Sequence, residues 1–239
     1  MQSQPISNRG YTHPELLAET EWLSHWIHHP KLRLIDARQP NEYLKAHLPG
    51  AVNISGFGGI PRAENGDMAE PEEFSRLASD FGISNDMTII VYDAPSQMMG
   101  TIAWAFLYYG HPDVRILDGG FAKWASEGRP TSDEVPDYPP AIYSPKTIDP
   151  LYCSLNHAKE AIHAPKTIFW DTRSLPEYEG TTPSGQTVPA TRQGRIPGAV
   201  HLDWHELFEP ETRTLKPANA LHAILVSRGI TPECEINTY

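Results

Sequence analysis

One three-part pattern occurs twice along this chain of 239 residues, and such a repeat constrains the fold more than any single residue does. Each copy has an apolar run that leads into Asp-x-Arg, then a Glu-Tyr pair, then a Pro-Gly-Ala-Val turn. The first copy occupies residues 34–38, 41–43 and 47–52, and the second occupies residues 168–173, 176–178 and 195–200. Two copies of a pattern this long predict two copies of one structural unit.

Short apolar runs alternate with segments of helical periodicity in both halves of the chain. Strands are predicted at 32–36, 87–92, 114–117, 167–171 and 235–239, and helices at 20–28, 40–45, 72–81, 98–109, 121–126, 155–163, 176–179 and 217–228. Strands that alternate with helices indicate an α/β fold, in which helices flank a parallel sheet. We expect two such domains, at 16–131 and 151–239, the second of them incomplete at its C-terminal end.

Two irregular segments interrupt this order. Residues 132–150 are rich in proline and have little periodicity, so they are predicted to form a linker. The second copy of the repeat carries an insertion, because Asp171 and Pro197 are 26 positions apart where Asp36 and Pro49 are 13 apart. The inserted residues 181–193 predict a surface loop of the kind that often shapes a substrate entrance.

Composition excludes several classes of partner. The formal net charge of −11, from 19 basic and 30 acidic residues, argues against nucleic acid and against an anionic membrane. The longest apolar stretch, residues 102–109, is too short to span a bilayer, and the N-terminus lacks the order of a secretion signal. Two cysteines without metal-ligand spacing indicate a reducing compartment. We expect a soluble, cytoplasmic monomer that holds no metal and no cofactor.

A third motif, Ile-Leu-Asp-Gly-Gly-Phe-Ala-Lys-Trp at residues 116–124, follows the first copy of the repeat. Taken in order, these motifs resemble those of the rhodanese family of sulfurtransferases, specifically its tandem type with two rhodanese-like domains. The resemblance covers residues 15–239. It implies transfer of sulfane sulfur from a small anionic donor, thiosulfate or 3-mercaptopyruvate, to a thiol or cyanide through a cysteine persulfide.

The resemblance also implies where the nucleophile belongs. In this family the reactive cysteine follows the strand ahead of the long helix, where backbone N–H groups stabilise a thiolate and cradle an anion. In the first domain Asp93 holds that position, and Pro95 removes one N–H group from the loop. A carboxylate cannot carry a persulfide, so this domain is expected to be silent. In the second domain the position comes directly after Tyr239, and residues 1–239 alone are therefore expected to be inactive.

Four residues of the second domain are candidates for substrate binding. Arg173 follows a predicted strand and has two open roles. It could hold an anionic substrate or orient the active loop, or it could form a structural salt bridge to Asp171 or to a carboxylate of the loop. Glu177 stands where many tandem enzymes carry a basic residue that contacts the substrate. Arg192 and Arg195 could supply that positive charge instead, which leaves the identity of the sulfur donor open.

The sequence leaves two points to interpret, the role of the two cysteines and the alternatives to sulfur transfer. Cys153 and Cys234 are interpreted as structural, and Cys234 lies between Glu233 and Glu235, whose charges disfavour a thiolate. A non-catalytic rhodanese module for partner binding or regulation stays open, as does a phosphatase of the same fold. A cysteine and a short loop after Tyr239 would indicate sulfur transfer, whereas a longer loop that closes on arginine would indicate a phosphatase.

Overall fold

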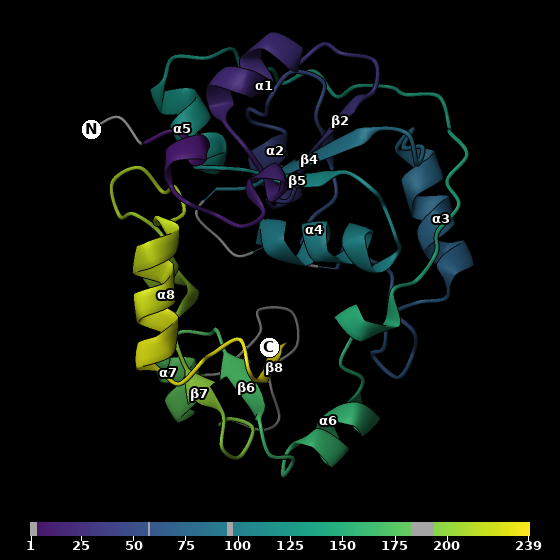
Figure 1. Ribbon diagram of the computed structural model, residues 1–239. Coiled ribbons are helices and arrows are strands. Elements are labelled where there is room, and N and C mark those ends of the chain that lie inside the picture. The colour runs from purple at the N-terminus through teal and green to yellow at the C-terminus, as the bar shows by residue number, and fades with distance from the viewer. Residues whose placement is uncertain (1–3, 57, 95–97, 183–193) are drawn as a thin grey trace. The chain divides into compact units, whose positions relative to one another are not determined.

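The computed structural model describes residues 4–56, 58–94, 98–182 and 194–239 (Figure 1). The chain divides into two compact units. Unit 1 comprises Met1–Tyr152 with Glu211–Thr214, and unit 2 comprises Cys153–Pro210 with Leu215–Tyr239. None of the helices in the described ranges has the length and apolar character that crossing a membrane requires.

Unit 1 is built on a five-stranded parallel sheet, as the α/β prediction requires. The strands are β1 (Leu17–Ala18), β2 (Leu32–Asp36), β3 (Val52–Asn53), β4 (Thr88–Tyr92) and β5 (Val114–Leu117), in the order β1-β5-β4-β2-β3. Every residue of β2 is buried, which is typical of a strand that helices cover on both faces. The pairing sets the C-terminal ends of β2 and β4 side by side, because Asp36 is in register with Tyr92.

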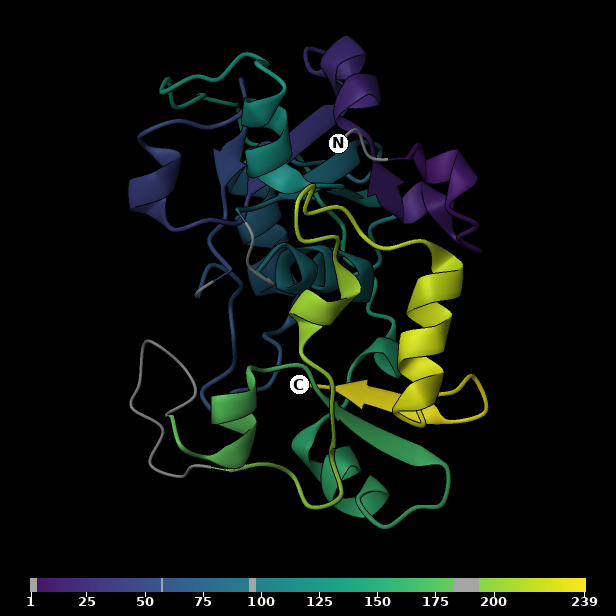
Figure 2. The same ribbon diagram turned by 90° about the vertical axis from the view of Figure 1, so that its left-hand side faces the viewer.

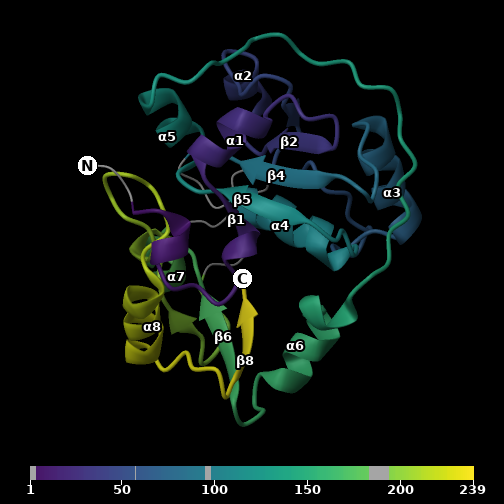
Figure 3. The same ribbon diagram turned by 45° about the horizontal axis from the view of Figure 1, so that its top comes forward.

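Helices cover both faces of this sheet. They are α1 (Thr20–Trp26), α2 (Pro40–Tyr43), α3 (Pro71–Asp80), α4 (Met98–Tyr108) and α5 (Gly120–Ser126), with 3-10 helices η1 (Ile6–Asn8), η2 (Pro14–Leu16) and η3 (Asp149–Leu151). Figure 3 shows α1 and α5 on one side of the sheet and α4 on the other. Leu23 and Trp124 belong to the core on the first side, and Phe74 and Phe106 belong to the core on the second.

The proline-rich segment 132–150 is fixed to unit 1 and is not a free tether. Ser132 and His47 exchange two backbone hydrogen bonds of 2.8 Å. The hydroxyl of Tyr138 donates to the carbonyl oxygen of Gly50 at 2.9 Å. Farther along, Tyr143 is only 3% exposed and belongs to the core that α3 and α4 share. The segment therefore stabilises unit 1, a role that its composition did not reveal.

Unit 2 repeats the central pairing with fewer strands. Its parallel strands are β6 (Thr167–Asp171), β7 (Val200–His201) and β8 (Glu235–Thr238), in the order β7-β6-β8, and its helices are α6 (Leu155–Ala161), α7 (Leu175–Glu179), η4 (Trp204–Leu207) and α8 (Ala218–Ser227). Figure 2 shows β8, in yellow, beside β6, in green. The order β7-β6-β8 corresponds to β3-β2-β4 of unit 1. Ala161, Phe169 and Ala199 form one buried cluster in unit 2, and Leu202 and Ile230 are buried there as well.

Candidate active site

The Asp-x-Arg motif forms a buried crosslink at the C-terminal end of β2. The carboxylate of Asp36 is fully buried and accepts hydrogen bonds from Arg38, at 2.9 Å from Nε and at 2.6 Å from Nη2. The same Nη2 donates to the carbonyl oxygen of Ala46 at 2.6 Å. This two-point contact matches the fork of a guanidinium to a carboxylate. It ties the end of β2 to the segment that leads into the Pro-Gly turn.

The second copy of the motif builds the same crosslink in unit 2. Arg173 donates to the buried carboxylate of Asp171, at 2.9 Å from Nε and at 2.5 Å from Nη2, and to the carbonyl oxygen of Gly194 at 3.0 Å. Burial alone would raise the pKa of Asp171, but the hydrogen bonds from Arg173 outweigh burial and hold that pKa below its usual value. These contacts are of the structural kind, so they favour the second of the two roles considered for Arg173.

A tyrosine hydroxyl marks the end of the neighbouring strand in each unit. In unit 1 the hydroxyl of Tyr92, the last residue of β4, accepts a hydrogen bond from the N–H group of Leu48 at 3.0 Å. In unit 2 the hydroxyl of Tyr239, which follows β8, accepts one from the N–H group of Ile196 at 3.1 Å. Leu48 and Ile196 each precede the Pro-Gly turn of their own copy of the repeat.

The main chain repeats the same correspondence. The carbonyl oxygen of Tyr92 accepts a hydrogen bond from Ala37 N–H at 2.8 Å, and that of Tyr239 accepts one from Thr172 N–H at 3.1 Å. Ala37 and Thr172 are the middle residues of the two Asp-x-Arg motifs. Tyr239 is therefore the counterpart of Tyr92, and the position after Tyr239 is the counterpart of Asp93.

Asp93 occupies the nucleophile position of unit 1 with a buried carboxylate. The residue is 2% exposed, and its Oδ2 accepts a hydrogen bond of 3.1 Å from the N–H group of Met99 in the first turn of α4. Its carbonyl oxygen accepts one of 2.8 Å from Phe121 N–H, and a Cβ at Gly120 would lie only 2.3 Å from that oxygen. Pro95 lies outside the described residues. The anionic side chain thus takes up an N–H group at the positive end of the helix.

The other described candidates, Glu177 and Arg195, lie at or beside α7. Glu177 accepts hydrogen bonds from Ser174, at 3.1 Å from the N–H group and at 2.6 Å from Oγ, and so caps its own helix. Arg195 is exposed, donates to the carbonyl oxygen of Tyr178 at 3.3 Å and lies over the Tyr178 ring at 4.3 Å. Arg192 lies outside the described residues. Of the described candidates, Arg195 carries the charge that is most open to solvent.

The two tyrosines are site residues that the sequence interpretation did not single out. The signal was present, because Tyr92 and Tyr239 end two predicted strands that hold the same place in the two copies of the repeat. What the sequence could not show is the acceptor role of each hydroxyl, since its donor lies more than forty positions away in the chain.

Both cysteines belong to unit 2 and are partly buried. Burial and the neighbouring Glu235 raise the pKa of Cys153, which disfavours its thiolate. Cys234 lies 3.8 Å from the hydroxyl of Thr231. Within the described ranges, no group of three or more His, Cys, Asp or Glu side chains could hold a metal ion.

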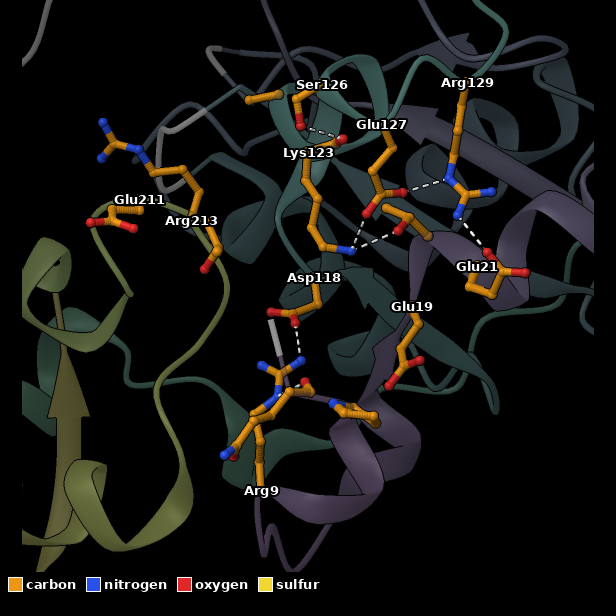
Figure 4. A pocket seen from close by; sticks show the side chains of 15 residues that line it. Arg9, Glu19, Glu21, Asp118, Lys123, Ser126, Glu127, Arg129, Glu211 and Arg213 are labelled. Atoms are coloured by element: carbon orange, nitrogen blue, oxygen red, sulfur yellow. Dashed lines mark hydrogen bonds and ion pairs between the residues drawn. The ribbon is translucent and has the colours of Figure 1, made fainter. Parts of the chain in front are cut away.

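A cavity of about 790 Å³ in unit 1 has walls lined by charged side chains (Figure 4). Three of its lining cations are paired with carboxylates of the same walls: Arg9 with Asp118 at 2.5 Å, Lys123 with Glu127 at 2.7 Å, and Arg129 with Glu21 at 2.7 Å. The walls also carry the carboxylates Glu19 and Glu211, so the cavity has no excess of positive charge and is poorly suited to a small anionic sulfur donor.

Comparisons with known proteins show the family of this chain. The model of the rhodanese-like domain matches residues 19–127. The sulfur carrier protein TtuD of Thermus thermophilus is 35% identical over 239 residues, which cover 96% of this chain and 84% of that protein. A thiosulfate sulfurtransferase of Corynebacterium glutamicum is 32% identical, with 90% of this chain and 75% of that protein covered.

A solved structure shares the fold over nearly the whole chain. The 3-mercaptopyruvate sulfotransferase SseA of Escherichia coli superposes with a TM-score of 0.81 at 24% identity, over 93% of this chain and 87% of its own. At that identity the likeness concerns the fold alone.

Proposed function

This chain belongs to the rhodanese family of sulfurtransferases, and we propose that it transfers sulfane sulfur through a persulfide on a cysteine that directly follows Tyr239. The donor is thiosulfate or 3-mercaptopyruvate, and the acceptor is a thiol or cyanide. The two units act as two rhodanese-like domains, of which only the second performs chemistry.

The observation that carries this proposal is the match between Tyr239 and Tyr92. Each tyrosine ends the strand beside an Asp-x-Arg strand, and each uses its hydroxyl and its carbonyl oxygen on equivalent partners. The position after Tyr92 faces the N-terminus of α4, where Asp93 binds a backbone N–H group. The corresponding position of unit 2 is thus the one at which loop N–H groups would stabilise a thiolate.

The chemistry at that position is a pair of displacements at sulfur. The thiolate attacks the outer sulfur of thiosulfate, a new S–S bond forms, the S–S bond of thiosulfate breaks, and sulfite leaves with the electron pair. An acceptor thiolate or cyanide then attacks the outer sulfur of the persulfide, and the cysteine thiolate leaves with the electron pair. Neither step needs an external oxidant or reductant.

We assign the described candidate residues either a structural role or a role in attracting the anionic donor. Asp171 and Arg173 hold the strand ends together, because their side chains are committed to each other and to Gly194. Arg195, and Arg192 in the inserted segment, would attract the anionic donor, while Glu177 caps α7. Asp93 keeps unit 1 silent, since its carboxylate repels an anion and cannot hold a sulfur atom.

The names of the two relatives bear on different substrates of the reaction, the sulfur donor and the sulfur acceptor. One is a thiosulfate sulfurtransferase, and the other, at 35% identity, is a sulfur carrier protein. The closer likeness to a carrier favours a thiol, on a protein or on a small molecule, over cyanide as the physiological acceptor.

Mass spectrometry of the full-length gene product tests the proposal. After incubation with thiosulfate or 3-mercaptopyruvate, we expect a gain of about 32 Da, one sulfur atom, on the cysteine after Tyr239. Replacing that cysteine with serine should abolish both the mass gain and the sulfur transfer, whereas Cys153→Ser and Cys234→Ser should preserve them. Residues 1–239 alone should gain no sulfur. Another residue type after Tyr239, or a persulfide on Cys234, would refute the assignment.

A further inference from the structure

Tyr239 connects three segments of unit 2 through its main chain and its side chain. Its N–H group donates to the carbonyl oxygen of Trp170 at 3.1 Å. Its carbonyl oxygen accepts two hydrogen bonds from Thr172, one from N–H at 3.1 Å and one from Oγ1 at 3.0 Å. At the far end of the side chain, the hydroxyl accepts the N–H group of Ile196. Both ends of the residue are therefore held in place.

Arg173 of the Asp171–Arg173 crosslink lies near the same ring. The guanidinium carbon of Arg173 lies 5.3 Å from the centre of the Tyr239 ring. Burial, together with a hydrogen bond to Asp171, raises the pKa of Tyr239 to about 12. The phenol therefore stays protonated near neutral pH, so that it donates toward Asp171 while it accepts from Ile196.

We infer that Tyr239 is a positioning residue for sulfur transfer, whose hydroxyl fixes the backbone from which the nucleophile projects. This inference rests on the proposed function. Since the next residue along the chain is the proposed nucleophile, a small rotation of Tyr239 would displace the reacting sulfur. A misplacement of about 1 Å can slow a reaction about a hundredfold. The hydroxyl is thus expected to matter for the rate of the chemical step more than for binding of the donor.

Unit 1 contains a matched control for this role. Tyr92 makes the corresponding hydroxyl contact with Leu48 N–H, at 3.0 Å against 3.1 Å for Tyr239 and Ile196. The residue after Tyr92 is Asp93, which cannot take up sulfur. A change at Tyr92 therefore reports the structural value of the contact without any chemistry behind it.

The test compares Tyr239→Phe with Tyr92→Phe in the full-length protein. Each change keeps the ring and removes only the hydroxyl, and each should lower the free energy of unfolding by about 1 kcal/mol. In single-turnover reactions with thiosulfate, Tyr239→Phe should lower the limiting rate of persulfide formation by about tenfold to a hundredfold, with little change in the half-saturating concentration. Tyr92→Phe should leave that rate within about twofold of the unmodified protein.

The pH dependence of the persulfide-forming rate and a second variant distinguish a positioning role of Tyr239 from a role in stability alone. If Tyr239 aligns the loop N–H groups with the thiolate, Tyr239→Phe should also shift the acidic limb of the rate profile to higher pH. Thr172→Val removes the hydrogen bond from Thr172 Oγ1 to the carbonyl oxygen of Tyr239. This variant should also lower the limiting rate of persulfide formation. Equal rates for Tyr239→Phe and Tyr92→Phe would overturn the positioning role and leave the proposed function intact. If the unmodified protein forms no persulfide, the proposed function itself fails.

Discussion

Asp36 is a carboxylate with no solvent contact, and the fold tolerates it because Arg38 lies against it. The oxygens of Asp36 accept from Nε and Nη2 of Arg38 and also from its main-chain N–H at 3.0 Å. A buried pair of this kind contributes little when intact, but removing one partner leaves an uncompensated charge.

Replacing Arg38 with alanine should therefore lower the free energy of unfolding of unit 1 by about 3–5 kcal/mol. Denaturant unfolding measures this loss. The control is Arg76→Ala, because Arg76 and Glu73 form an exposed pair at 3.8 Å. That change should cost less than about 0.5 kcal/mol. Equal losses for the two variants would show that burial does not set the value of the Asp36–Arg38 pair.

At the same scale, the structure shows contacts of the candidate residues that the sequence could not show. Arg173 had two open roles, and its contacts with Asp171 and Gly194 are those of a crosslink. Glu177 was considered for substrate binding, and its carboxylate caps α7. Such roles depend on which acceptors the fold brings within about 3 Å, and spacing along the chain does not encode that.

Among the elements, α5 has both ends fixed by specific contacts, a close backbone approach at its start and ion pairs at its end. It begins at Gly120, whose φ of 56° and close approach to Asp93 leave no room for a larger residue. Its last turn carries Lys123, and Glu127 follows the helix. Glu127 accepts from Arg129 Nε at 2.5 Å and pairs with Lys123 at 2.7 Å, so one carboxylate gathers two cations.

Unit 1 should lose stability in acid through this carboxylate. Burial would raise the pKa of Glu127, but hydrogen bonds from Lys123 and Arg129 outweigh burial and lower it from 4.5 to about 2. A carboxyl group with a lowered pKa in the folded state contributes stability that is fully present above pH 4.5 and is lost as the pH falls through about 2.

The variant Glu127→Gln should accordingly be less stable than the unmodified protein at pH 7, and the difference should shrink as the pH falls from 4.5 toward 2. Urea unfolding at a series of pH values measures this. Two curves that stay parallel over the whole acid range would contradict the assignment.

Periodicity located the long elements well, and the structure confirms strands at 32–36, 114–117 and 167–171 as predicted. The strands β1, β3 and β7 escaped prediction because each has two residues, too few to show a period. Most of the inserted segment, residues 183–193, lies outside the described ranges.

On the scale of the whole molecule, the segment between the repeats makes contacts that the sequence interpretation did not include. Proline content and weak periodicity indicated a linker, yet Tyr143 lies in the core of unit 1. Its ring stands 5.8 Å from the ring of Phe74 and is stacked on that of His111. One aromatic residue in an irregular segment has no periodic signal, so only the folded contacts reveal it.

Replacing Tyr143 with alanine should cost about 3–5 kcal/mol of unfolding free energy, the usual loss for a buried aromatic side chain. Its neighbour provides the control, since Ile142 is 86% exposed and Ile142→Ala should change stability by less than about 0.5 kcal/mol. Tyr143→Phe should be neutral or stabilising, because the buried hydroxyl has no hydrogen-bond partner among the described residues. If Tyr143→Ala and Ile142→Ala both change the unfolding free energy by similarly small amounts, the segment does not stabilise unit 1.

The placement of the two cysteines divides the chain chemically as well as structurally. Both follow residue 152, so the larger unit carries no thiol that peroxide, an alkylating reagent or a mercurial could attack. Sulfur delivered to this polypeptide meets no competing cysteine thiol in residues 1–152. A disulfide between the two units cannot form either, because unit 1 has no cysteine. A fluorescent maleimide would, for the same reason, report on one half alone.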